Sequence, residues 1–588
     1  MRRYILGLML GILCLTGCEK QAATTNDAQV IETQNPELVG ESAVGWEQIQ
    51  QIPIEEYTDW DDDNATRIQL TGEDVKIRGG GCTVKKDIVH IKKAGTYIVE
   101  GTWEDGSIWI EARKEDTVRL VLNGVNMKNS DGPAILSRTA AATIISLAPE
   151  KENTIADGRK HTDTGKAKAN GVLTVKGSLT INGTGTLHLT GNYKNGISCS
   201  GNLSILDSTL TVDARKTAVQ SRDVCSVRGG RLDLESGSMG IRTTGEQGIL
   251  AVEGGVIQIE SEKNGIDLSS GLLVKSSSFS IKSGGGSVQD PFGKEMQAAR
   301  GIEAADRIDI EQGTFQIDSS DTGIFGGEAM VIHTGNIVLS SRQNGIRTED
   351  GIRIEDGIVK IQDSFNGIEA GGLQMEEGDL FITARNSGMV CGGGVTIHTS
   401  SRNAGEKQED GGIVINGGAV TILAEMSGLD INGSLFLKEG ILTIYCPDYV
   451  EDSIINLSGS CSITGGTLMA SGGGGQTNLS GGSSQQPILM VRLKEVQKSQ
   501  TLLTILNEKG ENVFACAPVK DYKTVVICSA ALEQEKQYEL YLGGAIAEVA
   551  ENGIAAGNLL EVGNLTESFK IEGLVTYAGD FPGQNEQK

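Results

Sequence analysis

Five acids and one amide are the side chains whose spacing most suggests a functional site. Four of the acids follow a recurring glycine by two residues, and these are Asp267, Glu303, Glu369 and Asp430. Asp321 lies two residues before such a glycine, and Asn432 lies close to Asp430. Carboxylate and amide oxygens are ligands of hard cations. Acids on repeating positions would suit several weak cation sites in line, and the alternative is that they are solvated side chains at the corners of a repeat.

The chain offers little to other common kinds of site. Its 588 residues carry a net charge of −26, which argues against a nucleic-acid binder that uses a basic groove. Five scattered histidines lack a ligand spacing, and no Walker loop, His-Glu-x-x-His or paired Cys-x-x-Cys motif occurs. The acidic segment Asp59–Asn64 has Leu70 where an EF-hand loop has its twelfth, bidentate acid. We therefore expect no nucleic-acid partner and no EF-hand.

Trp109 is a candidate for contact with a sugar ring. Apolar and polar residues alternate from residue 107 to residue 113, which puts Trp109 on the polar side of a strand. A flat ring on that side can stack on a sugar. The alternative is that the ring packs beneath the N-terminal segment, against Trp46, Tyr57 or Trp60.

A repeat of about 22 residues spaces these side chains. A short residue, a glycine and an aliphatic residue recur, with the glycine at positions 196, 240, 265, 301, 323, 345, 367, 388 and 428, and Ala218 takes the remaining place. Five of the steps are 22 residues long. Steps of 36 and 40 residues contain polar insertions near Ser287–Ala299 and Ser400–Asp410. A second glycine turn and a strand of alternating polarity follow within the period, as in Gly254–Ile259.

Strands and turns at a period of ~20–30 residues predict a solenoid. Leucine-rich repeats would need regular leucines, and propeller blades are about twice as long. The sequence therefore predicts an all-β parallel β-helix with rungs ~4.8 Å apart, in which Ile197, Val219, Ile241 and their successors form an inward ladder. Glycine at the corner would permit either a positive φ or a close approach of two backbones.

Composition also predicts the domain boundaries. We expect a signal peptide at 1–17, a tether at 18–64, the β-helix at 65–470 with capping rungs at its start, a Gly/Ser linker at 471–486 and a small β domain at 487–588. The repeat places Cys199 and Cys391 many rungs apart, which favours buried free thiols in the stack. Two pairs closer in sequence remain possible disulfides: Cys446 with Cys461, and Cys516 with Cys528.

The N-terminus is typical of an exported protein. Arg2 and Arg3 precede the apolar run Tyr4–Leu15, which is short for a membrane span, and no other apolar run is long enough for one. Residues 15–18 resemble the bacterial lipobox, whose cysteine is acylated. The resemblance implies a lipid on Cys18 and anchoring at the extracellular face of the cell membrane. Loss of two positive charges with the signal peptide would take the mature chain from −26 to −28. The alternative is a plain cleaved signal.

Six segments carry a wider resemblance: Ala94–Thr102, Val121–Val125, Ser130–Ile135, Ile181–Leu187, Leu429–Ser434 and Ala517–Tyr522. Together, across roughly residues 65–588, they resemble a family of exported bacterial carbohydrate-binding domain proteins. The resemblance implies a right-handed parallel β-helix, Ca²⁺ as cofactor, and plant cell-wall polysaccharides, pectic or cellulosic, as partners. Where that family often has Asp-Asp-Gly or Asp-Gly-Ile at its corners, this chain usually has Asn, Thr, Ser or Met before the glycine. The implied calcium ligands are Asp267, Glu303, Asp321, Glu369, Asp430 and Asn432.

The resulting hypothesis is a cell-surface lipoprotein that binds polysaccharide with the help of calcium. A rival is a polysaccharide lyase on the same fold, with Arg222, Arg242 or Arg347 as its base. None of these arginines shows an obvious acid set repeated on neighbouring rungs, so binding is favoured over catalysis. A third hypothesis is an adhesin or scaffold without a sugar site. Because the negative body should repel a polyuronate, binding one would need a bridging cation or a local basic patch.

Overall fold

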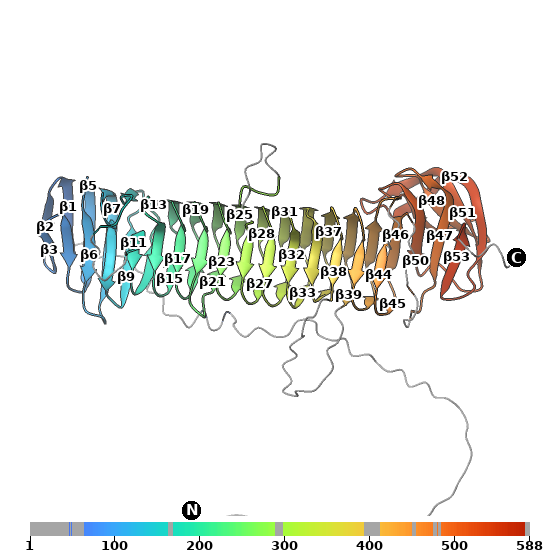
Figure 1. The fold of residues 1–588 in the computed structure, drawn as a ribbon, viewed down its shortest axis with the longest axis horizontal. Helices are drawn as coiled ribbons and strands as arrows, with labels where there is room; N and C mark the ends of the chain where they lie inside the picture. The colour runs from blue at the N-terminus through green and yellow to red at the C-terminus, as the bar shows by residue number, and fades with distance from the viewer. Residues whose placement is uncertain are drawn as a thin grey trace, which may run out of the picture. The chain divides into compact units, whose positions relative to one another are not determined.

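The computed structural model describes residues 64–162, 169–288, 298–392, 412–449, 454–473 and 484–581, together with Trp46, Ile49 and Leu479. The elements assigned within these ranges are 53 β-strands, most of which stack side by side in chain order (Figure 1). The described residues contain no helix with the length and apolarity to cross a membrane. The expected signal peptide at 1–17, Cys18 and nearly all of the tether lie outside the described residues.

Each rung contributes one strand to each of three faces. Face 1 is one parallel sheet apart from its first pair: β3 (Cys82–Lys85), β4 (Ile88–Ile91), β6 (Ser107–Glu111), β8 (Ile135–Thr139), β11 (Gly171–Val175), β14 (Asn195–Cys199), β17 (Val219–Ser221), β20 (Ile241–Thr243), β23 (Ile266–Leu268), β26 (Ile302–Ala304), β29 (Ile324–Gly326), β32 (Asn344–Thr348), β35 (Asn366–Ala370), β38 (Met389–Cys391), β41 (Leu429–Ile431) and β44 (Ile455–Leu457).

Face 2 consists of β9 (Ala142–Leu147), β12 (Ser178–Asn182), β15 (Leu203–Ile205), β18 (Cys225–Val227), β21 (Leu250–Val252), β24 (Leu272–Val274), β27 (Ile308–Ile310), β30 (Met330–Ile332), β33 (Gly351–Ile354), β36 (Gly372–Met375), β39 (Ile413–Ile415), β42 (Leu435–Leu437) and β45 (Cys461–Ile463). Face 3 consists of β10 (Glu152–Ala156), β13 (Thr186–Gly191), β16 (Thr209–Ala214), β19 (Arg231–Ser236), β22 (Val256–Ser261), β25 (Ser278–Ser283), β28 (Thr314–Ser319), β31 (Asn336–Ser341), β34 (Ile358–Asp363), β37 (Asp379–Ala384), β40 (Ala419–Ala424), β43 (Ile441–Tyr445) and β46 (Thr467–Gly472).

Three long strands join faces 2 and 3 at the N-terminal end. They are β1 (Thr66–Gly72), β5 (Gly95–Trp103) and β7 (Thr117–Lys128), which pair in parallel. The first half of β7 pairs with β9 and its last residues pair with β10, so the sheet divides there. At the open end, β2 (Val75–Arg78) pairs antiparallel with β1, and β3 pairs antiparallel with β4. These two hairpins form the start of the stack.

The register confirms the inward aliphatic ladder. Val219 pairs with Ile241 and Ile241 with Ile266, and all three side chains are buried. Ile266 pairs with Ile302 across the 36-residue step, and Met389 pairs with Leu429 across the 40-residue step. The insertions therefore occur at corners between strands and do not shift the register of the ladder.

Two columns of glycine serve different purposes at the corners. Gly345, in the recurring motif, does not have a positive φ, but an added Cβ would lie 2.6 Å from the carbonyl oxygen of Gly367 on the next rung. Close backbone approach therefore explains this column. Gly357, in the second turn, has a φ of 102°, which a side chain would strain.

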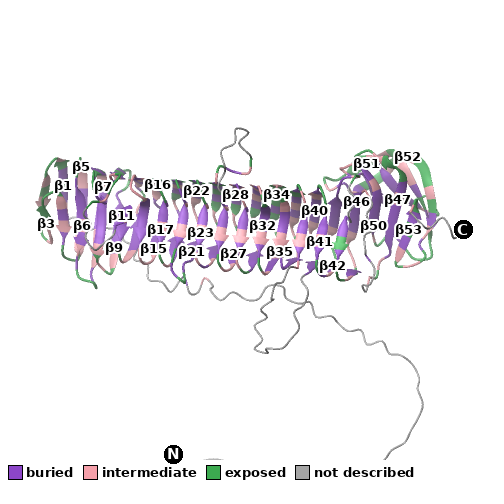
Figure 2. Ribbon diagram, viewed as in Figure 1, coloured by how far each residue is buried: buried purple, intermediate pink, exposed green. Residues whose placement is uncertain are grey.

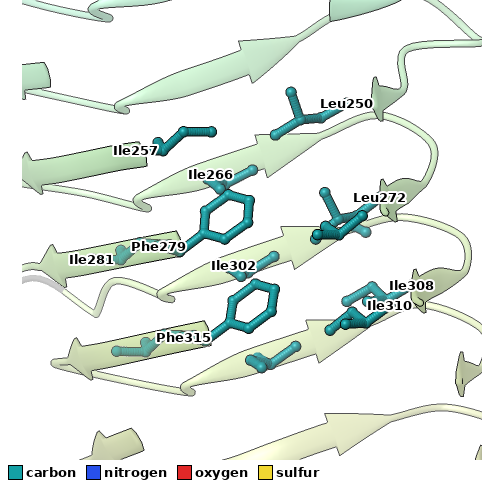
Figure 3. Close-up of a cluster of buried hydrophobic side chains, with 14 of the residues drawn as sticks. Leu250, Ile257, Ile266, Leu272, Phe279, Ile281, Ile302, Ile308, Ile310 and Phe315 are labelled. Atoms are coloured by element: carbon teal, nitrogen blue, oxygen red, sulfur yellow. The ribbon is translucent and has the colours of Figure 1, made fainter. Parts of the chain in front are cut away.

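One core fills the solenoid along its length (Figure 2). Phe279 and Phe315 stack within it, with ring centroids 4.6 Å apart and planes 6° apart, between aliphatic side chains from all three faces (Figure 3). The eight cysteines of the described residues are free thiols, seven of them buried. The two possible disulfides, Cys446–Cys461 and Cys516–Cys528, are not formed; Cys516 and Cys528 even lie in different core clusters.

The C-terminal region is more closely joined to the solenoid than the expected linker implies. The last strand of face 3, β46, includes Ser471 and Gly472 and pairs antiparallel with β50 (Tyr522–Cys528). β47 (Ile488–Gln497) and β53 (Val575–Gly579) extend the same sheet. A separate four-stranded sheet contains β49 (Asn512–Cys516), β48 (Leu503–Asn507), β51 (Gln537–Val549) and β52 (Ala555–Lys570).

Two residues of the expected tether contact the solenoid. Ile49 is buried, and Trp46 packs beside it, against a cluster formed by Val224, Ile249, Ala251 and Leu273. Ala251 and Leu273 occupy the middle of β21 and β24 on face 2. The segment expected to lift the body from the membrane is therefore in contact with it at these two positions.

Candidate functional site

The middle residues of the face-1 strands form a single outward row. In register along the stack, this face-1 row consists of Gln220, Arg242, Asp267, Glu303, Phe325, Arg347, Glu369, Val390, Asp430 and Asn456. The row is partly exposed on strands whose neighbouring residues are buried, which Figure 2 shows at the middle of β23 and β35. The three acids predicted to share a column, Asp267, Glu303 and Glu369, do share it, and Asp430 lies in the same row.

Arginines accompany the first acids of the row. The Nε of Arg242 lies 3.9 Å from a carboxylate oxygen of Asp267 on the next rung. Arg300, at the corner just before β26, lies 2.8 Å from Glu303 and 3.6 Å from Asp321. Asp321 is thus brought to the edge of the row through Arg300.

Phe325 forms the centre of the row. The Cζ of Arg300 lies 3.9 Å from the centroid of the Phe325 ring, and that of Arg347 lies 5.9 Å from it, both within the range of cation–π attraction. Arg347 also lies 3.5 Å from Glu369 and 3.3 Å from Glu349. Two guanidinium groups therefore hold the ring among carboxylates, on a part-exposed surface.

The electrostatics of this region favour cations over anions. Arg242, Arg300 and Arg347 lie beside five acids, which are Asp267, Glu303, Asp321, Glu349 and Glu369, and Asp430 lines the same hollow as Arg347. Burial raises the pKa of Asp267 above its usual value, although Arg242 and Arg300 act in the opposite direction. The row would therefore repel a polyanion unless a cation were added.

A small hollow lies at the C-terminal part of the row. Its volume is about 210 Å³, and Arg347, Glu369, Val390, Asp430 and Asn432 are among its lining residues. Asp430 accepts a hydrogen bond from the side-chain amide of Asn456 at 3.0 Å. The Oδ1 of Asn432 accepts one from the hydroxyl of Ser458 at 2.9 Å. Here polar side chains from three rungs border one concavity.

The acids fit the expected calcium sites poorly. Asp267, Glu303, Asp321 and Glu369 each have an arginine as neighbour, and a guanidinium competes with a cation for the same oxygens. Across the described ranges, no three side chains of His, Cys, Asp or Glu come together as a metal site would require. Asp430 and Asn432 lie at the hollow, and within the described residues no ion pair joins Asp430 to an arginine, so calcium at this end of the row stays a prediction.

Trp109 lies far from the centre of the row, although it has the same outward position on β6. The guanidinium of Arg138 covers its ring at 3.8 Å, and His90 meets it edge-on at 5.7 Å. Glu111 binds both neighbours, at 2.8 Å from His90 and 3.1 Å from Arg138. One ring face is thus occupied, and Trp46, an expected partner of Trp109, packs on face 2 instead.

The three arginines considered for a lyase differ in their surroundings. Arg242 and Arg347 belong to the row and lie beside acids of neighbouring rungs, contrary to the expectation that they lack such acids. Arg222 lies outside the row and 3.9 Å from Asp223.

Sequence reasoning missed Phe325 and Arg300. Phe325 follows Gly323 by two residues, as the predicted acids follow their glycines, so the repeat itself contained this signal. Arg300 directly precedes a motif glycine, but only the fold reveals that its side chain reaches Glu303, Asp321 and Phe325.

A family comparison covers most of the solenoid. The sequence model of the carbohydrate-binding domain-containing protein family matches residues 85–345 and 337–483. The chain belongs to this family. The resemblance to this family is thereby confirmed, and the match includes five of the six segments, all but Ala517–Tyr522, and the whole face-1 row.

Two further similarities concern single proteins. A carbohydrate-binding domain-containing protein of Acetivibrio thermocellus is 32% identical over 136 residues, which are 23% of this chain and 48% of that protein. The chain thus matches about half the length of this curated relative. A solved structure of a polysaccharide lyase-like protein from C. thermocellum, a gadolinium derivative, is 28% identical. That alignment covers 38% of this chain and 92% of the other, with a TM-score of 0.37.

Proposed function

We propose that this carbohydrate-binding domain-containing protein holds plant cell-wall polysaccharide along the face-1 row without cleaving it. The observation that carries the proposal is the row itself, in which polar side chains and one aromatic ring repeat in register over consecutive rungs. Such a surface offers one extended chain hydrogen bonds and apolar contact with the part of the Phe325 ring that Arg300 does not cover. The family membership supports carbohydrate as the ligand class.

The regular spacing suits a polymer better than a single sugar. Rungs are ~4.8 Å apart, so the row from Arg242 to Asp430 presents a contact at short, even intervals. Each contact is weak because the side chains are partly exposed and already paired. Several weak contacts on one long molecule add up through effective concentration.

The charge of the row favours neutral, cellulosic chains over pectic ones. Acids outnumber arginines there, and the whole chain carries −26. A polyuronate would need a bridging cation, for which Asp430 and Asn432 at the 210 Å³ hollow are the remaining candidates. Calcium is therefore proposed for acidic polymers only.

The proposed location is the extracellular face of the cell membrane, with a lipid on Cys18 as the anchor. The sequence from Arg2 to Cys18 supports this part of the proposal. Labelled fatty acid should appear on the wild-type protein and be absent from Cys18→Ala. An unlabelled wild-type protein would contradict the anchor without affecting sugar binding.

The binding proposal is tested with purified full-length chain and soluble polymers. We expect retention on a neutral β-glucan, a loss of about tenfold in affinity for Phe325→Ala, and no loss for Asn336→Ala, a polar residue on face 3. Polygalacturonate should bind only with calcium present. Unsaturated product, detected by ultraviolet absorbance, would instead establish a lyase. A wild-type protein that binds no polymer under either condition would favour the adhesin hypothesis.

A further inference from the structure

Face 3 carries a larger hollow than the face-1 row. Its volume is about 800 Å³, and it extends across the outer side of β16, β19, β22, β25, β28 and β31 and touches β34. We call it the face-3 groove. It lies on a different sheet from the face-1 row, since each rung turns a corner between the two faces.

Two columns of side chains in register line the groove. The first consists of Thr211, Asp233, Gln258, Ser280, Gln316 and Val338. The second consists of Asp213, Glu235, Glu260, Lys282, Asp318 and Ser340. Five rung steps of ~4.8 Å give each column a length of about 24 Å. The groove is therefore long, narrow and parallel to the direction in which rungs stack.

Part of the lining is fixed by contacts within the protein. Arg231 lies 2.8 Å from Asp233 and also donates a hydrogen bond to Gln258. Lys282 lies 3.9 Å from Glu260. Asp318 accepts a hydrogen bond from the backbone N–H of Ser287 at 2.7 Å, which ties the start of the long insertion to the edge of the groove.

Other polar groups of the groove are at least partly exposed to solvent and are available to a ligand. Within the described ranges, the side chains of Gln316, Ser280 and Thr211 make no hydrogen bond to protein, and neither do the carboxylates of Asp213 and Glu235. An amide offers both donors and acceptors, a hydroxyl offers one of each kind, and a carboxylate accepts strongly from a hydroxyl. This mixture matches a ligand rich in hydroxyl groups.

The charge of the groove selects among such ligands. Five acids, Asp213, Asp233, Glu235, Glu260 and Asp318, face only two cations, Arg231 and Lys282. A polyuronate would bring further carboxylates beside acids that lack a compensating cation, which costs binding energy. A neutral chain has no such cost, and its hydroxyls can donate to the free carboxylates.

We propose that the face-3 groove is a second binding site, which takes one extended chain of a neutral polysaccharide and excludes polyuronates by charge. The site rests on the proposed function, because it assumes that the protein meets polysaccharide. A single sugar residue of an extended β-linked glucan is similar in length to one rung of ~4.8 Å, so successive sugars meet successive rungs of the two columns. Two sites on separate faces would let one molecule bind two chains.

The experiment measures the affinity of the full-length chain for cellohexaose and for hexagalacturonate, without calcium, by titration calorimetry. Removing two neutral hydrogen-bonding groups with Gln258→Ala and Gln316→Ala together should weaken cellohexaose binding about tenfold. Asn336→Ala is the matched control, because it lies on the outer side of face 3 but outside the groove lining. Conversely, Glu235→Gln with Glu260→Gln should create measurable binding of hexagalacturonate at moderate salt, where the remaining negative charge of the chain is screened.

The outcomes separate this site from the face-1 row. The groove proposal is overturned, and the face-1 proposal stands, if the wild-type protein binds cellohexaose and the variant Gln258→Ala with Gln316→Ala binds it as tightly as Asn336→Ala does. A stoichiometry of two that falls to one in the groove variant, and independently to one in Phe325→Ala, supports both sites. A wild-type protein that binds neither oligosaccharide nor polymer overturns both. Unfolding temperatures equal to that of the control exclude a folding defect as the cause.

Discussion

The substitution Gly345→Ala tests why glycine recurs in this chain. The new Cβ would lie 2.6 Å from the carbonyl oxygen of Gly367 and 2.7 Å from a methyl group of Ile361. Ordinary contacts of this kind are near 3.5 Å, and the oxygen belongs to a backbone held in the ladder. Overpacking of a core typically costs ~1–3 kcal/mol. Because φ is not positive, the smaller unfolded-state entropy of alanine returns ~0.4–1 kcal/mol. We expect a net loss of about 1–2 kcal/mol.

A solenoid unfolds locally as well as globally, so the assay must resolve rungs. Hydrogen exchange should show less protection in β32 and β35 of the variant and little change ten rungs away. Gly80→Ala is the control, because its Cβ would meet nothing within 4 Å and its φ is not positive. The close-approach explanation is refuted if both variants have equal protection and equal denaturant midpoints.

Four further predictions concern single groups. Burial raises the pKa of Asp267, so its ionised form lowers the stability of the fold at neutral pH, and this penalty disappears as pH falls through the folded-state pKa. Asp267→Asn should therefore be more stable than wild type at pH 7 but not in acid. Thermal melts at both pH values would show the difference. The thiols of Cys225 and Cys391, with pKa values raised to about 12 by burial, should resist alkylation at pH 8 until denaturant is added; oxidised thiols after denaturation would be the contrary result. Trp109→Ala should lower the unfolding temperature while leaving glycan affinity unchanged, because the ring packs against Arg138 and His90 and lies outside the part of the row from Arg242 to Asp430. Calcium titration should give at most one weak site, lost in Asp430→Ala; several equivalent sites would contradict the arginine pairing seen along the row.

The repeat made the ladder and the row predictable, because both depend only on a residue's distance from a motif glycine. Asp267, Glu303 and Glu369 share a column for the same reason that Ile266, Ile302 and Ile368 do. What that distance cannot reveal is the direction of long side chains across rungs. Arg300 is 21 residues from Asp321, yet it pairs with it because the corners of adjacent rungs lie next to each other. The calcium hypothesis was based on the positions of the acids alone and did not include the arginines that pair with them.

The ends of the solenoid were harder to predict because the repeat stops there. Trp46 and Ile49 belong to a segment that the sequence predicts to be a tether, and the outward apolar cluster around Leu273 explains why they pack there. The Gly/Ser-rich segment read as a linker joins strands of one continuous sheet, since β46 and β50 pair over 50 residues apart in sequence. Composition indicates how a segment can bend, but it carries no information about which edge a later strand will pair with.

The insertions indicate how the two proposed binding surfaces can differ on one scaffold. The 36-residue step leaves face 3 after β25 and returns to face 1 at β26, and Ile266 still pairs with Ile302. The insertion at this corner therefore does not alter the packing register of the core. The insertion does reach the outer surfaces: Gly284 and Gly286, just before it, have positive φ, and Ser287 at its start donates its N–H to Asp318 at the edge of the face-3 groove. Arg300, directly after the insertion, pairs with Glu303 and covers Phe325 on the face-1 row. Residues at the two ends of this insertion thus contribute to both surfaces, and the register of the ladder is unchanged. Deletion of the insertion should therefore change sugar binding on both faces while the rungs remain folded.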